Sequence, residues 1–546
     1  MNATAPARWF LPLVIVIVIV IAVFISLIMT NVHYGYAIDE ASYVYVAREV
    51  RNWFSKLVER PVAESFSHEA IVEDWHFLER ADARPTNRHS NFNLPMAMHV
   101  MNAGWLVAHK WCPELLCYRL GSMVLFSLAV AMTFATIRER TNTLFGLTSA
   151  LLLYLNPRPF AHAHLAATET ALSSFWLLSL LCLARFEHSA IARGRTIWGI
   201  LSGICFGCLI ATKLTGWLII VPVGVWLAIH RPHGSVRLIL TWIFFGIAIL
   251  LLATPNLWLH PFDELWGYVR ASLDNPWKIS TSYGGFVYQG NMPIESGIVI
   301  FCVTNPLTLL TAGALGLLVA MRDRLALLLT LSLVFVLTVR TFGLMPTHDV
   351  DRQFAMAYYL LPCLAGLALG TMSRWLSPTL KSHEATAVLG SLLIAIGALA
   401  EPYFDWQSYR NHGLCYFNRA VGGLHGAAER GFEISYWFEA VTDQDWRNMI
   451  DQIPHKSTVF FRPDHPGIED LISWKLWRRD IVITGDPQNA DYLLLYAKPS
   501  FYSAPSQSVR TDLWRVQQEG PANYVLSAHG VRLLSLVATG RNTDKN

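Results

Sequence analysis

Two adjacent acidic residues, Asp39 and Glu40, are the first candidates for chemistry in this sequence. They follow an apolar segment long enough to cross a bilayer and precede an amphipathic helix that we expect over 43–57. Paired carboxylates a few residues from a membrane surface could accept a proton or hold a polar acceptor. The alternative is structural, because a carboxylate at the start of a helix can cap its first turn and is favoured by the helix dipole.

A further acidic residue, Glu169, lies in the segment HAHLAATETALSSFWLL near the outer end of a predicted span. A carboxylate at a membrane helix end is costly unless it is solvated or paired, so it is a functional candidate. Beside it, His162 and His164 could complete a metal site, but their spacing matches no standard zinc motif. The sequence therefore indicates no metal ligand and no cofactor, although a divalent metal is compatible with it.

Two basic residues, Lys213 in ATKLTGW and Arg352 in HDVDRQFAMAYYLLP, lie on the side of the predicted membrane domain where basic residues are few. A phosphate suits both, because arginine binds it bidentately and lysine binds it as a point charge. The alternative is ordinary salt bridging, with Asp349 or Asp351 as partners of Arg352. A carboxylate base and phosphate-binding cations on one membrane face are typical of a transferase whose donor is a lipid phosphate.

The composition predicts a membrane protein. Of the 546 residues, 53% are hydrophobic and only 15% are charged, against about 25% charged in soluble proteins. The 42 basic and 39 acidic residues give a formal net charge of +3, so no strong field exists to attract nucleic acid. We expect a multispanning α-helical protein without a polynucleotide partner.

Windows of about 20 apolar residues predict about eleven transmembrane helices. The candidates lie near 11–30, 115–137, 143–155, 166–186, 197–211, 214–229, 236–254, 297–320, 325–342, 354–373 and 386–402. Arginines concentrate in alternate short loops, which places the N-terminus in the cytoplasm. Two long loops, about 31–113 and 255–296, and all residues after about 402 then lie outside, in the periplasm if the protein is in a bacterial inner membrane.

Two regions outside the predicted spans have hydrophobic patterns that predict secondary structure. The helix over 43–57 has one apolar face, from Tyr43 to Leu57, which could lie in the membrane interface or pack on the protein. Within 403–546, short apolar runs at 458–461, 480–484 and 491–496 predict strands that alternate with helices near 443–452 and 467–478. We expect a transmembrane domain over 1–402 and a small α/β periplasmic domain over 403–546.

Several segments, taken in order, resemble the polyprenyl-phosphate-dependent glycosyltransferases of the GT-C superfamily. The similarity extends to the bacterial relatives of protein O-mannosyltransferases and of lipid A aminoarabinose transferase. The segments are IDEASYVYVAREV (38–50), RLGSMVLF (119–126), ATETALSSFWLL (167–178), GICFGCLIATKLTGWLIIVP (203–222), YQGNMP (288–293), TNPLTLL (304–310), DRQFAMAYYLLPCLAGL (351–367) and YFNRAVGGLHGAAERGFEISYW (416–437).

The resemblance implies a GT-C fold and a role for each candidate residue. Asp39 matches the catalytic acid of the first outer loop, Glu40 its neighbour and Glu169 the second acid, while Lys213 and Arg352 match contacts to the lipid phosphate. The family often has a His-Pro-Pro-like segment in the first outer loop, where this chain reads HSNFNLPMAMH (89–99). There, Asn91, Asn93 and His99 could contact the acceptor or the donor instead.

The implied function is transfer of a sugar from a polyprenyl-phosphate carrier to a hydroxyl of a lipid, glycan or protein, with inversion, by a multi-pass enzyme of the bacterial inner membrane. The implied partners are the lipid-linked donor, the acceptor and membrane lipids. A transporter or flippase of lipid-linked sugars is the alternative. It is less favoured because transporters usually contain internal repeats and broken helices near the bilayer midplane, and no repeat is visible here. A noncatalytic envelope scaffold that displays residues 403–546 is a third possibility.

Overall fold

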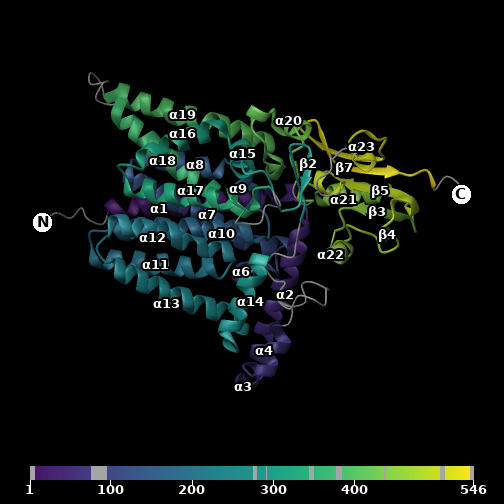
Figure 1. The fold of residues 1–546 in the computed structure, drawn as a ribbon, viewed down its shortest axis with the longest axis horizontal. Coiled ribbons are helices and arrows are strands. Elements are labelled where there is room, and N and C mark those ends of the chain that lie inside the picture. Colours follow the sequence, from purple (N-terminus) through teal and green to yellow (C-terminus); the bar gives the residue numbers. More distant parts are fainter. Residues whose placement is uncertain are drawn as a thin grey trace.

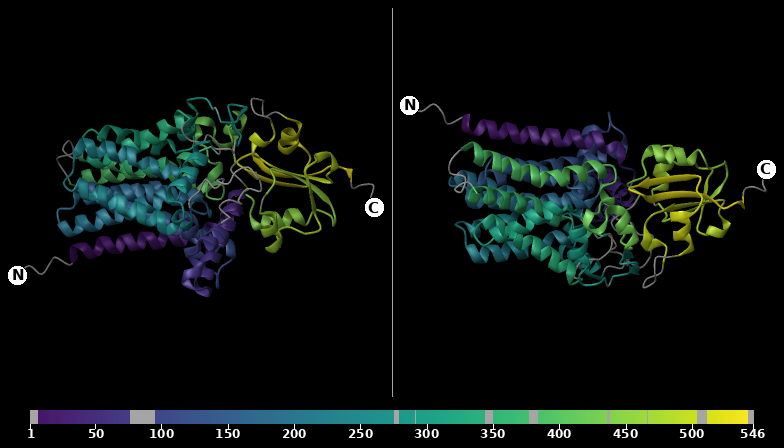
Figure 2. Two further views of the ribbon diagram at one scale, coloured as in Figure 1. Left: turned by 60° about the horizontal axis from the view of Figure 1, so that its bottom comes forward. Right: turned by 90° about the horizontal axis from the view of Figure 1, so that it is seen from above.

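The computed structural model describes residues 7–75, 95–274, 279–290, 292–343, 350–376, 384–435, 438–465, 467–503 and 511–541. In this part of the chain a long helical bundle adjoins a small C-terminal sheet (Figure 1). The N-terminus lies at the end of the bundle that is remote from this sheet in all three ribbon views (Figures 1 and 2).

Each predicted span corresponds to helical structure. The bundle contains α1 (Ala7–Thr30), α7 (Glu114–Arg140), α8 (Thr143–Tyr154), α10 (Thr168–His188), α11 (Ala192–Ile210), the 3-10 helix η2 (Leu214–Ile219) with α12 (Ile220–His230), α13 (Ser235–Ala253), α15 (Ser296–Val303), α16 (Leu307–Val319), α17 (Arg324–Thr341), α18 (Met356–Leu376) and α19 (Glu384–Tyr409). By length and composition, seven helices of the described chain can cross a membrane. This number is below eleven partly because three further apolar helices have only 10–17 residues.

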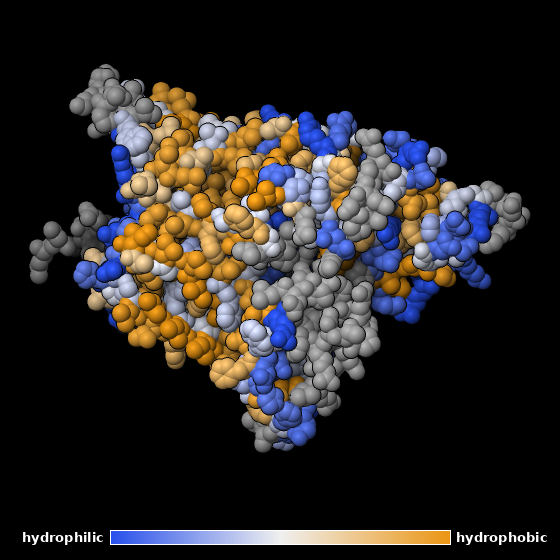
Figure 3. All heavy atoms as spheres, in the orientation of Figure 1, coloured by the Kyte–Doolittle hydropathy of each residue, from blue (hydrophilic) through white to orange (hydrophobic). Residues whose placement is uncertain are grey.

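The prediction of a multispanning helical membrane protein with a small C-terminal α/β part is confirmed. Helix α10 is the centre of the bundle, with 94% of its apolar window buried, whereas the corresponding windows of α1 and α19 are 11% and 17% buried. Figure 3 shows the consequence, because apolar side chains cover much of the visible bundle surface and polar ones gather around the C-terminal part. Such an apolar surface is what a protein surrounded by lipid tails requires.

Helix α11 packs closely along α13 because its residues at the contact are small. A side chain at Gly207 would place a Cβ 2.6 Å from the Phe245 carbonyl oxygen, and one at Gly203 would place a Cβ 3.0 Å from that of Thr241. Glycine at these positions therefore lets the two backbones approach, as in other membrane helix pairs.

Helix α2 (Ile38–Glu59) crosses the end of the bundle nearest the C-terminal sheet (Figure 1). Its predicted apolar face is mostly buried, including Tyr43, Val46, Val50 and Trp53, and the helix contacts α4 (His68–Trp75) and α6 (Met96–Ala108). Of the two alternatives for this face, packing on the protein is what the structure shows. The short helices α3 (Val62–Ser65), α9 (Pro157–His162) and α14 (Pro261–Asp274) and the hairpin β1–β2 (Thr281–Tyr283, Phe286–Tyr288) are also present.

The C-terminal part contains a five-stranded sheet of order β4-β3-β5-β7-β6. Strands β3 (Thr458–Arg462), β4 (Val482–Thr484) and β5 (Tyr492–Tyr496) are parallel, and β7 (Val531–Ala538) pairs antiparallel with β5 and with β6 (Tyr524–Ala528). The three parallel strands are the three expected from the sequence. Helices α20 (Gly423–Glu429), α21 (Asp443–Ile450), α22 (Ile468–Ser473) and α23 (Asp512–Glu519) complete this part. The last long helix, α19, continues through Pro402 to Tyr409.

Candidate active site

Arg352 is the centre of a cluster that joins the two acidic candidates. Its Nε donates to Glu169 Oε1 at 2.5 Å, and its Nη1 forms an ion pair with Asp39 Oδ2. Asp39 lies in the first turn of α2, Glu169 in the first turn of α10, and Arg352 in a short 3-10 helix (Arg352–Phe354) before α18. Three elements that are distant in the sequence thus bring an arginine between two carboxylates.

Tyr43, expected from the sequence only as part of the apolar face of α2, is a further member of the cluster. Its hydroxyl is hydrogen-bonded to Arg352 Nη2, and the arginine carbon Cζ lies 5.8 Å from the centre of its ring. Burial raises the pKa of Tyr43, so the phenol stays protonated at neutral pH. The signal that could have identified it is its spacing, because Tyr43 is four residues after Asp39 on the same face of α2.

Lys213 reaches the cluster from a break between helices. Its backbone is extended between the end of α11 and the start of η2, and its Nζ lies 3.9 Å from Glu169 Oε1. The Lys213 side chain is 12% exposed, the Asp39 side chain 23% and the Glu169 side chain 1%. The cluster is therefore open to solvent on the Asp39 and Lys213 side and closed around Glu169.

Glu40 points away from this cluster into the protein. Its carboxylate forms a bidentate ion pair with Arg119, at 2.8 Å from Nε and 2.6 Å from Nη2, and both side chains are at most 1% exposed. Glu40 also accepts from the Ala166 amide at 2.7 Å and from the Ala37 amide at 3.0 Å. The capping bond at the start of α2 is thus made by Glu40 rather than by Asp39, and the same carboxylate ties α2 to α7 and to the segment before α10.

A second buried ion pair flanks Arg352 in sequence. Arg158 Nη1 lies 2.7 Å from Asp351 Oδ1, and His162 Nε2 lies 3.9 Å from Asp351 Oδ2. Burial disfavours the charged form of Asp351, but Arg158 and His162 outweigh it and hold the pKa of this carboxyl below its usual value. Asp351 therefore pairs with Arg158, while Arg352 pairs with Asp39 and Glu169. Asp349, the other partner considered for Arg352, lies outside the described residues.

The C-terminal part holds the loop that leads to Asp39. Tyr36 donates its hydroxyl to Asp470 Oδ2 at 2.6 Å, and His465 Nε2 lies 2.9 Å from the Tyr36 carbonyl oxygen. Arg48 of α2 is also 2.9 Å from Asp470 Oδ1. The position of the first turn of α2 consequently depends on α22 and the residues before it.

The two histidines beside Glu169 have separate surroundings. His164 is fully buried, stacks on Tyr34 with ring centres 4.2 Å apart, and lies 2.8 Å from both the Phe160 carbonyl and Thr30 Oγ1. Burial lowers its pKa to about 3. Across the described residues, no group of three or more His, Cys, Asp or Glu side chains has a geometry that could hold a metal ion.

Of the three candidate residues in the first outer loop, the structure describes only His99. Asn91 and Asn93 lie outside the described residues. His99 is on α6, where its Nε2 lies 2.9 Å from the Ala253 carbonyl oxygen, and burial lowers its pKa. His99 thus joins α6 to the end of α13, and its ring also lies 5.7 Å from that of Phe54 on α2. The start of α6 is nevertheless near Lys213, because the Met96 amide donates to the Ala211 carbonyl at 3.1 Å.

Residues 96–271 match the model of the family described as dolichyl-phosphate-mannose-protein mannosyltransferase. The resemblance to the GT-C superfamily is confirmed. The matched segment includes Glu169 and Lys213, whereas Asp39 precedes it and Arg352 follows it in the sequence. The fold brings these two residues to Glu169.

Comparison with solved structures gives two kinds of similar protein. ArnT from Cupriavidus metallidurans bound to undecaprenyl phosphate has 14% sequence identity and a TM-score of 0.49, over 98% of this chain and 99% of that one. The oligosaccharyltransferase of Archaeoglobus fulgidus in its apo form has 12% identity and a TM-score of 0.41, over 74% of this chain and 61% of that one. A comparison with curated proteins gives no match.

Proposed function

We propose that this protein is a glycosyltransferase that moves a sugar from a polyprenyl-phosphate carrier to a hydroxyl acceptor, with inversion at the anomeric carbon. The observation that supports it most is the convergence of Asp39, Glu169 and Arg352, with Lys213 beside them, at the end of the bundle next to the C-terminal part. The match to a family whose name specifies a lipid-phosphate-linked sugar donor supports the choice of substrate.

Arg352 and Lys213 are the residues we assign to the donor phosphate. Both approach Glu169, which holds the two cations on one side of the cluster. A phosphate that takes up the guanidinium group of Arg352 competes with Asp39 for it, because both anions need the same donors. Donor binding would thereby release the Asp39 carboxylate from its ion pair.

Released Asp39 is then the general base. It accepts the proton of the acceptor hydroxyl as that oxygen attacks the anomeric carbon, and the bond from this carbon to the phosphate oxygen breaks. Polyprenyl phosphate leaves, and its developing charge is stabilised by Lys213 and Arg352. An ion-paired carboxylate is a poor base, so release by the donor would limit proton abstraction to the loaded enzyme.

The proposed location is the bacterial inner membrane, with the site and the C-terminal part in the periplasm. The excess of arginine at the bundle end that holds the N-terminus supports this orientation. The acceptor is a hydroxyl of an envelope lipid, glycan or protein.

The deciding experiment uses purified full-length protein in vesicles with undecaprenyl-phosphate sugars labelled in the sugar, and envelope extracts as acceptors. We expect free undecaprenyl phosphate to form in step with label transferred to the acceptor. Movement of intact donor across the bilayer without cleavage would instead establish the transporter alternative. Binding of the donor with neither cleavage nor movement, for every sugar tested, would contradict the proposal.

A further inference from the structure

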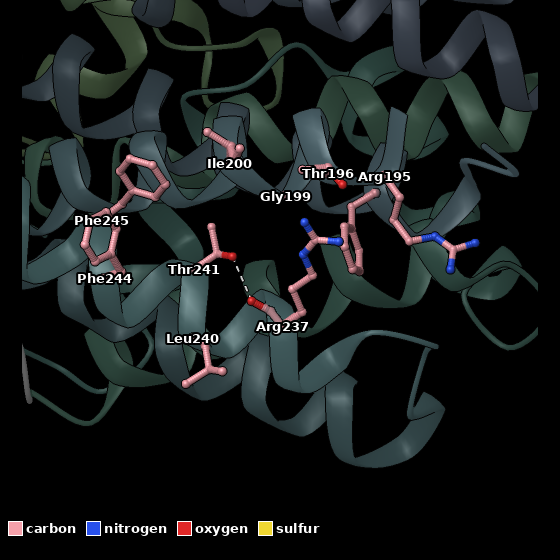
Figure 4. A pocket seen from close by; sticks show the side chains of 10 residues that line it. Arg195, Thr196, Gly199, Ile200, Arg237, Leu240, Thr241, Phe244 and Phe245 are labelled. Carbon is pink, nitrogen blue, oxygen red and sulfur yellow. Dashed lines mark hydrogen bonds between the residues drawn. The ribbon is translucent and has the colours of Figure 1, made fainter. Parts of the chain in front are cut away.

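A cavity of about 300 Å³ lies between the N-terminal halves of α11 and α13. Its walls include Phe186, Arg195, Gly199, Arg237, Leu240 and Phe244. In Figure 4 the Arg237 side chain extends from α13 toward Gly199 and Thr196 of α11, and the Arg195 side chain leaves α11 beside Thr196 with its guanidinium group directed away from that of Arg237. The cavity is at the bundle end remote from the candidate active site, because α11 begins here and ends near Lys213.

The two arginines of this cavity differ from three other arginines at the same end of the bundle. Those three are neutralised by acids, because Arg140 and Arg324 pair with Glu187 at 3.3 and 2.6 Å, and Arg185 pairs with Glu139 at 2.8 Å. Within the part of the chain that the structure describes, neither Arg195 nor Arg237 has a carboxylate within 4.0 Å. The cavity therefore has an excess of positive charge.

One nitrogen of Arg195 has an unsatisfied hydrogen-bond donor. Its Nη2 donates to the Ser189 carbonyl at 3.1 Å, but its Nε is buried and has no hydrogen-bond acceptor among the described residues. A buried donor without an acceptor is costly, so a bound anion would stabilise this site. The positive ends of the α11 and α13 dipoles add to the attraction.

The walls below the arginines open toward the lipid-facing surface. Leu240 is 60% exposed and Phe244 is 65% exposed, and both follow Arg237 along one side of α13. The cavity thus has a charged part at the two arginines and an apolar part at Leu240 and Phe244. A ligand that carries both a phosphate and an apolar chain matches the two parts. A free phosphate would match only the first part.

We propose that this cavity binds an anionic glycerophospholipid, with its phosphate between Arg195 and Arg237 and an acyl chain along Leu240 and Phe244. Basic pockets between transmembrane helices at the boundary of the bilayer suit such headgroups. The site is separate from the proposed donor site and does not depend on the proposed function. A lipid bound here would hold α11 and α13 together at the end where glycine packing no longer joins them.

The test measures lipid retention and melting temperature of the purified full-length protein in detergent, with phosphatidylglycerol, phosphatidylcholine or inorganic phosphate added. We expect phosphatidylglycerol to raise the melting temperature and to be retained in native mass spectra, and the other two to have little effect. The double variant Arg195→Gln, Arg237→Gln should retain about tenfold less phosphatidylglycerol, because it lacks both positive charges that bind the lipid phosphate.

The matched control is Arg193→Gln with Arg231→Gln, two exposed arginines at the same end that do not line the cavity. This control should retain phosphatidylglycerol as the parent does. If the double cavity variant does not fold, the single variant Arg237→Gln decides, because that side chain is exposed. Equal effects of the two lipids, an equal effect of inorganic phosphate, or equal losses in the cavity and control variants would overturn the proposal.

Discussion

At the scale of single residues, Asp39 and Arg352 form an ion pair in this structure but have separate roles in the proposed reaction. They neutralise each other in this structure, yet the proposed reaction needs the carboxylate as a base and the guanidinium as a phosphate ligand. Glu169 can keep Arg352 in place when Asp39 is displaced, because it binds a different nitrogen of the same side chain. The cluster is therefore suited to exchange one anionic partner of Arg352 for another.

Substitution Asp39→Asn tests the base. The amide keeps the volume but cannot take the proton, so we expect turnover to fall by about 10²–10⁴. Binding of undecaprenyl phosphate should be unchanged or tighter, because Arg352 no longer has Asp39 as a competing anion. Steady-state kinetics and phosphate-lipid binding on the same sample provide the measurement, and near-normal turnover would remove Asp39 from the mechanism.

Lys213→Met and Arg352→Lys test the phosphate ligands. The first keeps the chain length of Lys213 without its charge, and the second keeps the charge without the planar donor geometry. We expect weaker binding of undecaprenyl phosphate in both, by about 10-fold or more. Melting temperatures measured alongside separate the alternatives, since a loss of stability with unchanged binding would mean that these residues only neutralise Glu169.

The buried His164 makes stability depend on pH. Its folded pKa of about 3 lies below the value near 6.5 of an unfolded chain, so the unfolded state binds more protons between these values. The stability that neutral His164 contributes is present above about pH 6.5 and decreases as pH falls toward 3, by about 1 kcal/mol at pH 5.5. Melting temperature should fall less steeply from pH 7 to 5 in His164→Gln than in the exposed control His233→Gln; parallel slopes would contradict this.

At the scale of elements, the first turn of α2 presents two acids in two directions. Asp39 faces Arg352, whereas Glu40 faces inward to Arg119 of α7 and to the amide of Ala166. We infer that Glu40 positions the start of α2 relative to α10, which is a structural contribution to the same site. Its importance therefore does not require contact with a substrate.

Glu40→Gln should destabilise the protein by about 3–5 kcal/mol, because Arg119 remains buried without its counter-charge. The double variant Glu40→Gln, Arg119→Met should recover part of this loss, since neither charge is then buried alone. Thermal unfolding of the two single variants and the double variant measures the coupling. Full stability of Glu40→Gln together with lost turnover would instead assign Glu40 a direct role in the reaction.

At the scale of the whole molecule, the C-terminal part is joined to the site through Asp470. This residue contacts both Tyr36, before α2, and Arg48, within it. Asp470→Asn should lower turnover about tenfold with little effect on donor binding, because small displacements of a catalytic group reduce rate strongly. Asp480→Asn is the matched control, since the partners of Asp480 among the described residues are Arg478, His455 and the Lys456 amide, none of which belongs to α2. Equal turnover in both variants would mean that the C-terminal part does not position α2.

The sequence by itself determined the membrane class, the positions of the apolar helices and the three parallel strands of the C-terminal sheet. These features depend on local hydrophobic patterns, which are visible in windows of a few to about 20 residues. The candidate residues Asp39, Glu169, Lys213 and Arg352 could also be identified from the sequence, because charged groups beside apolar segments are rare. The β6–β7 hairpin was not expected, since its strands alternate too weakly in hydrophobicity to be recognised.

Only the tertiary structure decided which charged groups are partners. Arg352 contacts Glu169 across 183 residues and Tyr43 across 309, and Glu40 contacts Arg119 across 79. From sequence spacing, Asp351 was a natural partner for Arg352, but the fold gives it to Arg158. Such pairing depends on how α2, α7, α10 and the segment before α18 pack against one another. Side chains on different elements meet through that packing, and the local pattern of residues carries no information about it.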